Sequence, residues 1–285
     1  MKKVTVVINQ AKDVLLEVSK KVITELAKYA QVIYVDKEYS YNAPECVKFV
    51  DSSLLFEDTD VVITIGGDGT ILKIAPEIAK RGICVLGINL GRVGFMAELE
   101  PDEIGLLSSL FSGEYIIENR MMLDVDIFKK GDKVSTHTAL NDVVVMNGSI
   151  SRMIEIELLC NETHVSTYHA DGLILSTPTG STAYSLSAGG AVIDPFIECI
   201  LATPVCAHSF HNSRPIVFSP SSELCVVNKS TRDDNTYVTL DGNRNIQISY
   251  DEYVRIKKSQ FTTNLIKIKS NRFYNTLYNK LSERR

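Results

Sequence analysis

The 285-residue sequence predicts two domains, an N-terminal open α/β (Rossmann-like) domain and a C-terminal β-sandwich domain. In the first part, short apolar runs alternate with amphipathic stretches of helix length, which is typical of a mostly parallel sheet. From residue 119 onward, short strands follow one another directly, as in an antiparallel sandwich. We therefore expect domains over residues 1–118 and 119–268, and a C-terminal helix within residues 269–285.

The N-terminal domain is expected to begin with a strand at residues 3–9 and a helix at residues 11–29. In that helix the apolar residues form one stripe and the charges lie opposite, as in a helix that packs one face on a sheet. The stripe consists of Val14, Leu15, Val18, Val22 and Leu26. The further elements alternate along the chain, with strands at 32–35, 61–65 and 83–88 and helices at 70–80 and 101–111.

The second domain is expected to begin where apolar and polar residues alternate, between Met121 and Ile127. One helical interruption is expected near residues 180–190, and a last helix at residues 272–281. The other strands expected in this part lie at 143–146, 153–159, 165–168, 173–175, 215–218, 223–227, 236–240, 245–249, 253–257 and 264–268.

The most informative stretch is the glycine turn at residues 66–69, Gly-Gly-Asp-Gly, between an expected strand and an expected helix. Such a junction directs backbone N–H groups and a helix N-terminus at one point, which favours an anion such as phosphate. Asp68 would repel that anion unless it holds a metal ion or accepts a proton, so we interpret it as catalytic. The alternative is an ordinary turn in which the Asp68 side chain caps the helix.

A second candidate site is the loop at residues 176–187, where hydroxyl-bearing and glycine residues are dense. Its donors and the aromatic ring of Tyr184 suit a small polar ligand. Asp171, just before the expected strand, could accept hydrogen bonds from ribose or amide groups. The alternative gives Thr179 or Ser181 the role of a helix N-cap, which explains one hydroxyl but not their density.

Composition argues against a nucleic-acid-binding, a membrane-spanning or a zinc-binding protein. The formal net charge is −5 and no basic block occurs, so we expect no nucleic-acid partner. No apolar run approaches the ~20 residues of a membrane span, and the first residues form a strand pattern rather than a signal peptide. The six cysteines are scattered without a C-x-x-C pair, which indicates buried thiols in a reducing compartment. We expect a soluble, cytoplasmic protein without a zinc site.

Several motifs, in this order and over nearly the whole chain, resemble the NAD kinases. They are the glycine turn with Thr70, residues 87–95, Asn141-Asp142, Asp171-Gly172, residues 177–190, residues 208–216 and residues 241–243. Gly-Gly-Asp-Gly alone is shared with diacylglycerol- and sphingosine-type lipid kinases and, loosely, with phosphofructokinases. The Thr-Pro-Thr-Gly-Ser-Thr-Ala-Tyr stretch at residues 177–184 is much more specific to the NAD kinases.

The resemblance implies transfer of the ATP γ-phosphate to the 2′-hydroxyl of the adenosine ribose of NAD, giving NADP. It implies Mg²⁺ or another divalent metal ion, and ATP or polyphosphate as the phosphoryl donor. It further implies a homo-oligomer, commonly a homotetramer, and a C-terminal segment packed on the first domain.

By matching motifs, the resemblance also implies roles for individual residues. Asp68 would accept the proton of the 2′-hydroxyl, and Asn141 and Asp142 would hold ribose and adenine groups. Phosphate would contact Gly66, Gly67, Gly69, Thr70 and Lys73. The dinucleotide would contact Asp68, Gly69, Arg152, His169, Asp171, Thr182, Ala183, Tyr184, Ser185, Leu186, Ser187 and Asn243. Two of these depart from the family pattern, since His169 stands where arginine is more frequent and Asn243 where glutamine is usual.

Two other functions remain open. A lipid kinase would share Asp68 and the glycine turn but would need an apolar groove for its acceptor, which the polar loop at residues 176–187 disfavours. A non-catalytic dinucleotide sensor would need the pocket but no base, and would bind NAD without ATP-dependent turnover.

Overall fold

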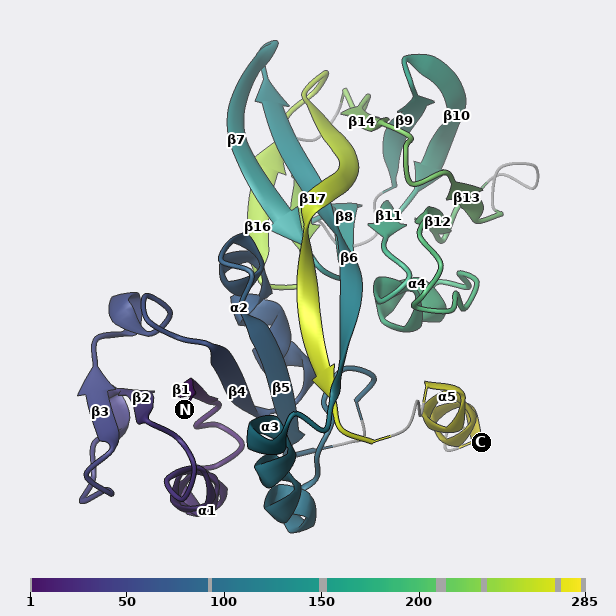
Figure 1. Ribbon diagram of the computed structural model, residues 1–285. Helices are drawn as coiled ribbons and strands as arrows, with labels where there is room; N and C mark the ends of the chain where they lie inside the picture. The colour runs from purple at the N-terminus through teal and green to yellow at the C-terminus, as the bar shows by residue number, and fades with distance from the viewer. Residues whose placement is uncertain are drawn as a thin grey trace. The chain divides into compact units, whose positions relative to one another are not determined.

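The computed structural model describes the chain at residues 2–91, 94–148, 153–208, 214–231, 235–269 and 273–282. The chain forms two compact units, the first made of Met1–Asn119 with Thr263–Arg285 and the second of Arg120–Thr262 (Figure 1). It passes between the units within two long strands, β6 (Ile116–Lys129) and β17 (Tyr253–Lys267). The expected α/β domain followed by a β-sandwich is confirmed.

The sheet of the first unit is parallel, with the strand order β5-β4-β1-β2-β3. The end of β17 adds to β5, also in parallel. The bounds are β1 (Lys3–Ile8), β2 (Val32–Asp36), β3 (Val47–Val50), β4 (Val61–Gly66) and β5 (Cys84–Asn89). From β1 the chain moves to β2 and β3 on one side, then returns to β4 on the other. The strand order therefore reverses between β1 and β4, and ligands of such sheets bind beyond the carboxyl ends at this point.

Helix α1 (Glu17–Leu26) is shorter than the predicted helix at residues 11–29. Its side chains Val22, Ile23 and Leu26 are buried, whereas Val14 and Leu15 are 69% and 70% exposed, so the predicted stripe was wrong at its start. The reason lies in Asp13, whose carboxylate accepts hydrogen bonds from the backbone N–H groups of residues 18 and 19. These bonds fix a turn before the helix.

The helical segments between β2 and β6 cover the same sheet or connect its strands, and a last helix follows β17. Helix α2 (Asp68–Lys80) begins directly at the glycine turn and packs on β4 and β5 (Figure 1). The predicted helix at residues 101–111 consists of a 3₁₀ segment, η3 (Pro101–Ser108), and a short helix, α3 (Ser109–Ser112). Two more 3₁₀ turns are η1 (Lys37–Tyr39) and η2 (Ser52–Leu54). Helix α5 (Phe273–Ser282) follows Arg272, which lies outside the described residues.

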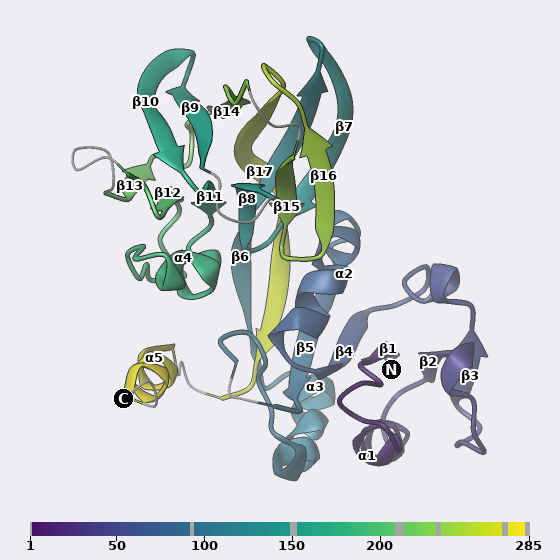
Figure 2. The same ribbon diagram turned by 180° about the vertical axis from the view of Figure 1, so that it is seen from behind.

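The second unit holds two antiparallel layers around one apolar core. One layer is a six-stranded sheet of order β13-β12-β11-β8-β15-β16 (Figure 2). The other contains β10-β9-β14-β17 and the hairpin of β6 and β7. The bounds are β7 (Asp132–Ala139), β8 (Asp142–Asn147), β9 (Ile154–Cys160), β10 (Thr163–Ala170), β11 (Gly172–Ser176), β12 (Ile200–Val205), β13 (Ile216–Phe218), β14 (Leu224–Asn228), β15 (Thr236–Leu240) and β16 (Arg244–Ile248).

Three strands of this unit differ from the prediction. Strand β7 was not predicted, and it forms a hairpin with β6. Strand β12 was not predicted, and its run Ile-Leu-Ala-Thr-Pro-Val is fully buried between β11 and β13. Strand β17 is one strand where two were predicted, at 253–257 and 264–268. The polar stretch between them contains neither glycine nor proline, so nothing in it ends a strand, and Ser259 and Thr263 are buried.

The helical interruption predicted near residues 180–190 is confirmed. It consists of a 3₁₀ turn, η4 (Gly180–Thr182), and a short helix, α4 (Tyr184–Ser187). Within the described residues, no helix is long and apolar enough to cross a membrane.

Candidate functional site

The glycine turn lies at the carboxyl end of β4, beside the point where the strand order reverses. Gly67 is the N-cap of α2 and has φ +145°, a backbone conformation that side chains rarely adopt. A Cβ at Gly67 would lie 3.0 Å from the ammonium of Lys12. The turn therefore needs glycine, and it leaves the first N–H groups of α2 accessible to a ligand.

Asp68 does not cap the helix that it begins. Its carboxylate accepts hydrogen bonds from the backbone N–H groups of Phe95 (2.7 Å), Met96 (3.1 Å) and Ala97 (3.0 Å). A Cβ at Gly94 would lie 2.1 Å from Asp68 Oδ1, so the loop approaches the carboxylate as closely as glycine allows. The capping alternative is wrong. Oδ1 accepts two of the bonds and Oδ2 one, which leaves one of the two acceptor sites of Oδ2 for a further proton donor.

The loop that binds Asp68 is held from its other side by the C-terminal segment. Lys267 Nζ donates to the Met96 carbonyl at 3.1 Å and pairs with Glu98 at 3.1 Å, with both side chains nearly buried. Glu98 Oε1 in turn accepts the backbone N–H groups of Ile268 and Lys269. Residues far apart in the sequence thus fix the orientation of the Asp68 carboxylate.

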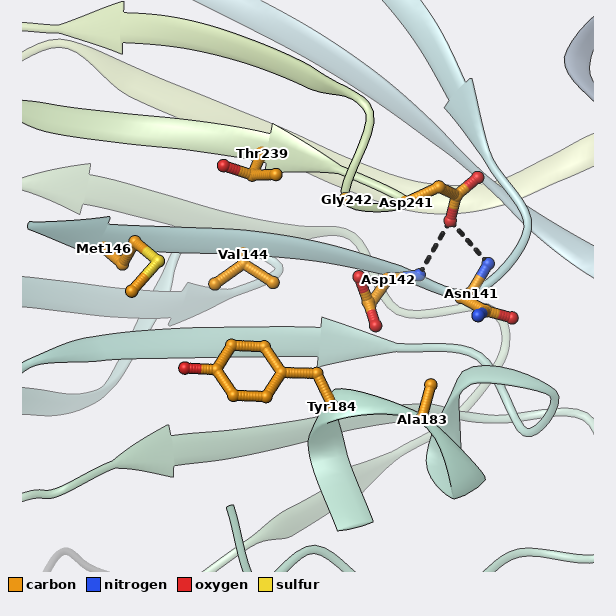
Figure 3. Close-up of a pocket in the computed structure, with 9 residues that line it drawn as sticks. All are labelled: Asn141, Asp142, Val144, Met146, Ala183, Tyr184, Thr239, Asp241 and Gly242. Carbon is orange, nitrogen blue, oxygen red and sulfur yellow. Dashed lines mark hydrogen bonds between the residues drawn. The ribbon is translucent and has the colours of Figure 1, made fainter. Parts of the chain in front are cut away.

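The second unit contains a pocket of about 330 Å³ (Figure 3). It is lined by Asn141, Asp142, Val144, Met146, Ala183, Tyr184, Thr239, Asp241 and Gly242. Strand β8 and the residue before it form its floor, the start of α4 contributes the Tyr184 ring on one side, and the end of β15 closes the other (Figure 3). Asn141 is 8% exposed, and its Oδ1 has no hydrogen-bond partner among the described residues.

Asp241 shapes the floor of this pocket. Its carboxylate accepts the backbone N–H groups of Leu140 (2.8 Å), Asn141 (2.7 Å) and Asp142 (3.1 Å). Burial raises the pKa of Asp241, while these three hydrogen bonds oppose the rise because they stabilise the ionised form. Burial, and next the charge of Asp241, raise the pKa of Asp142 to about 7. Asp142 therefore carries a proton below about pH 7 and loses it above that pH.

The hydroxyl-rich loop serves the fold more than the pocket. Thr177 Oγ1 donates to the Leu140 carbonyl and accepts from the Gly180 N–H. Ser181 Oγ donates to the Pro178 carbonyl at 2.6 Å, and Ser185 Oγ bonds to Thr203 Oγ1 at 2.9 Å. Neither Thr179 nor Ser181 caps a helix with its side chain. These three hydroxyls therefore fix the loop, whereas the buried Ser176 Oγ has no hydrogen-bond partner among the described residues.

Comparison with protein families identifies the chain. A model of the ATP-NAD kinase N-terminal domain matches residues 4–115, and one of the ATP-NAD kinase C-terminal domain matches residues 140–268. The NAD kinase of Caldanaerobacter subterraneus subsp. tengcongensis is 40% identical over 285 residues, all of both chains. The chain belongs to the NAD kinase family. The NAD kinase of Geobacter sulfurreducens is also 40% identical, over 223 residues and 78% of each chain.

Two solved structures of NAD and NADH kinases share the fold. Yeast NADH kinase complexed with NADH has a TM-score of 0.87 at 22% identity, covering 99% of this chain and 88% of that chain. The NAD kinase from Archaeoglobus fulgidus in complex with ATP has a TM-score of 0.72 at 25% identity, covering 98% of both chains. The fold of these two structures therefore extends over nearly the whole of this chain.

Within this NAD kinase, the pocket brings together four of the predicted dinucleotide residues: Asn141, Asp142, Ala183 and Tyr184. Thr182, Leu186 and Ser187 adjoin it in sequence but do not line it, and they stay predictions. His169 is exposed on β10. The Asn243 amide donates to the Asp241 carbonyl at 2.9 Å and so closes the β15–β16 turn. The carboxyl group of Asp171 accepts from the Cys206 thiol, whose pKa it raises.

The outcome for the remaining predicted residues varies. Arg152 and the middle of the 208–216 motif lie outside the described residues. Among the predicted phosphate ligands, Lys73 is exposed on α2. Sequence reasoning missed Lys12 and the pair of Glu98 and Lys267, and it gave Asp241, part of the motif at residues 241–243, no role of its own. A basic residue shortly after the first strand was a signal for Lys12, whereas the other three depend on contacts between distant parts of the chain.

The described residues contain no group of three or more His, Cys, Asp or Glu side chains that could hold a metal ion. Magnesium in nucleotide sites is commonly bound through one or two carboxylates together with substrate phosphates, so such a cluster is not required. The one free acceptor site of Asp68 Oδ2 can take a proton donor or a divalent ion but not both, so a metal ion used together with an Asp68 base would be held by the phosphates of the donor.

Proposed function

We propose that this NAD kinase transfers the γ-phosphate of ATP to the 2′-hydroxyl of the adenosine ribose of NAD, giving NADP and ADP. The observation that supports this most is the Asp68 carboxylate, fixed by three backbone N–H groups directly at the glycine turn. Full-length similarity to named NAD kinases agrees with it. A ribose hydroxyl is a weak nucleophile, so an oriented carboxylate base is the group that the reaction needs.

In the proposed reaction, Asp68 accepts the proton of the 2′-hydroxyl through Oδ2 as the 2′-oxygen forms its bond to the γ-phosphorus. The bond between that phosphorus and the β,γ-bridging oxygen breaks, and its electron pair leaves with ADP. The first N–H groups of α2 bind phosphate oxygens, with Gly66, Gly67, Gly69 and Thr70 forming the turn. Mg²⁺ bound to the donor phosphates would neutralise part of the developing charge.

The adenosine part of NAD is proposed to bind in the pocket of the second unit. Tyr184 offers an aromatic face on which adenine can stack, and Asn141 Oδ1 can accept from the adenine amino group because it has no partner among the described residues. Asp142, with its pKa raised to about 7, can donate or accept near neutral pH. Asp171, close to Tyr184, would bind a ribose hydroxyl or the nicotinamide amide.

The assembly and the remaining residue roles are proposals from the resemblance. We propose a homo-oligomer, specifically a homotetramer, in the cytoplasm, with polyphosphate as an alternative donor. His169, Thr182, Ser185, Leu186, Ser187, Asn243 and Arg152 are proposed to contact the dinucleotide, and Lys73 to contact phosphate. Sedimentation would test the assembly, and a fully active monomer of 31.7 kDa would overturn it.

One assay tests the reaction against both rival functions. Purified protein is incubated with Mg²⁺, with NAD, NADH or diacylglycerol as acceptor, and with ATP or polyphosphate as donor. We expect NADP to form from ATP and NAD. Phosphorylation of diacylglycerol but not NAD would favour a lipid kinase, and NAD binding without turnover would favour a sensor.

A further inference from the structure

The side chain of Lys12 lies at the glycine turn, although 54 residues separate Lys12 from Gly66. Its ammonium donates a hydrogen bond to the Gly66 carbonyl at 2.9 Å. A Cβ built at Gly67 or at Gly91 would lie 3.0 Å from the same nitrogen. The ammonium therefore sits among three glycine positions where the absence of side chains leaves it open to a ligand.

The strand order brings these residues together. Asn9 follows β1 directly, Gly66 ends β4 and Asn89 ends β5, and these three parallel strands are neighbours in the sheet. Lys12 stands in the loop after β1, at the point where the strand order reverses. Ligands of open α/β sheets bind in this position, so the topology places a cation where a ligand is expected.

The charge of Lys12 is not neutralised by the protein. Within the described part of the chain, the Gly66 carbonyl is the one hydrogen-bond partner of its ammonium, and no carboxylate forms an ion pair with it. An ammonium has three N–H donors, so two remain. A second observation at the same place is Asn89, which is 2% exposed and whose Oδ1 has no partner among the described residues. That oxygen lies 3.4 Å from a Cβ built at Gly67.

A phosphate chain is the ligand that fits this arrangement. The N-terminus of the 13-residue helix α2 and the Lys12 ammonium both carry positive charge, and they meet at the same turn. A lysine beside a glycine-rich turn can bind phosphate oxygens as a point charge. A protonated phosphate or a water molecule on it can donate to the free oxygen of Asn89.

We propose that Lys12 binds the phosphate chain of the phosphoryl donor at the glycine turn. This inference rests on the proposed kinase function. It names Lys12 as the positively charged residue that binds the donor phosphates, a role that the family resemblance had given to Lys73. Lys73 is exposed one turn further along α2, and it has no hydrogen bond or ion pair within the described residues. A nucleoside triphosphate and inorganic polyphosphate present the same chemistry to Lys12.

The test compares Lys12→Met with Lys73→Met and with a control, Lys80→Met, which removes an exposed lysine from the last turn of the same helix. Steady-state NADP formation gives KM for ATP and for NAD. Lys12→Met removes a charge-assisted hydrogen bond to the donor phosphates. Loss of such a bond should raise KM for ATP by about tenfold to a hundredfold. KM for NAD should stay within about twofold, and Lys80→Met should match the wild type. Lys12→Arg, which retains the charge, should recover most of the loss.

A ligand-binding readout separates this inference from the kinase function. Tripolyphosphate and ATP should each raise the thermal midpoint of the wild type, and Lys12→Met should lose both shifts. If Lys12→Met lowers the thermal midpoint of the ligand-free protein, Lys12→Gln takes the place of Lys12→Met in the same assays. Glutamine lacks the charge but retains an N–H donor for the Gly66 carbonyl. An unchanged KM for ATP with unchanged shifts would overturn the role of Lys12, and a loss confined to Lys73→Met would assign the cation to Lys73. A wild type that makes no NADP but is stabilised by tripolyphosphate would contradict the kinase function alone.

Discussion

Asp142 and Asp241 lie close together in the pocket. We predict that at alkaline pH the ligand-free Asp142→Asn variant is more stable than the wild type. Asp142 is 5% exposed, and burial together with the charge of Asp241 raises its pKa to about 7. Above that pH, the folded protein must hold a buried carboxylate close to a second one. An asparagine at this position keeps the size of the side chain and has no proton to lose.

The sign follows from proton binding. The unfolded chain releases the Asp142 proton near pH 3.8, whereas the folded chain holds it up to about pH 7. Protonated Asp142 therefore contributes stability that is fully present below the unfolded pKa and is lost as pH rises through the folded pKa. At about 1.4 kcal/mol per pKa unit, the loss between pH 5 and pH 8 amounts to roughly 2.5 kcal/mol.

The assay is urea unfolding of the wild type and of Asp142→Asn at pH 5 and at pH 8, without ligands. The free energy of unfolding of the wild type should fall by roughly 2.5 kcal/mol more than that of the variant between the two values. Asp132→Asn, at an exposed carboxyl at the start of β7, is the control and should follow the wild type. Parallel pH curves for the wild type and Asp142→Asn would refute the reasoning, since they would mean that Asp142 is ionised at both values.

Two further substitutions test the pocket and the loop that holds Asp68. Tyr184→Ala should raise KM for NAD through the loss of about 1–3 kcal/mol of stacking, with KM for ATP unchanged; a shift confined to ATP would contradict the pocket assignment. Lys267→Met leaves Glu98 buried without its cation, so the free energy of unfolding should fall by about 3–5 kcal/mol. The double variant with Glu98→Gln should recover much of that loss, and a single variant as stable as the wild type would contradict the role of the pair.

Most elements of the first unit could be predicted because each has a local signal, whereas strand β3 was not predicted. The β-branched run at residues 61–65 identified β4, and the glycines after it identified the turn between β4 and α2. The start of α1 could not be predicted from periodicity, because the backbone N–H groups of Val18 and Ser19 donate to the Asp13 carboxylate, and these bonds compete with a longer helix. Local patterns thus give the type of an element more reliably than its ends.

The hydrogen-bond partners of Asp68 and Asp241 could not be predicted from the sequence. Asp68 accepts from N–H groups 27 to 29 residues away, and Asp241 from N–H groups 99 to 101 residues away. Backbone N–H groups are present at nearly every residue, so no side-chain pattern marks such partners. In the loop at residues 176–187, by contrast, the sequence pattern was clear, because dense hydroxyls predicted a binding loop. The hydroxyls of Thr177, Ser181 and Ser185 instead form hydrogen bonds within the protein.

The most direct measurement of the catalytic assignment is kcat of Asp68→Asn, taken with ATP, NAD and Mg²⁺ well below its own thermal midpoint. Asparagine keeps one oxygen for the loop N–H groups but places an NH₂ group where the carboxylate has its other oxygen, so a lower midpoint is expected. As the base, Asp68 should account for about 10²–10⁴-fold in kcat, with KM for both substrates changed far less. A folded Asp68→Asn enzyme that makes NADP within about threefold of the wild-type rate would contradict the account, because the aspartate would then only hold the loop at residues 94–97.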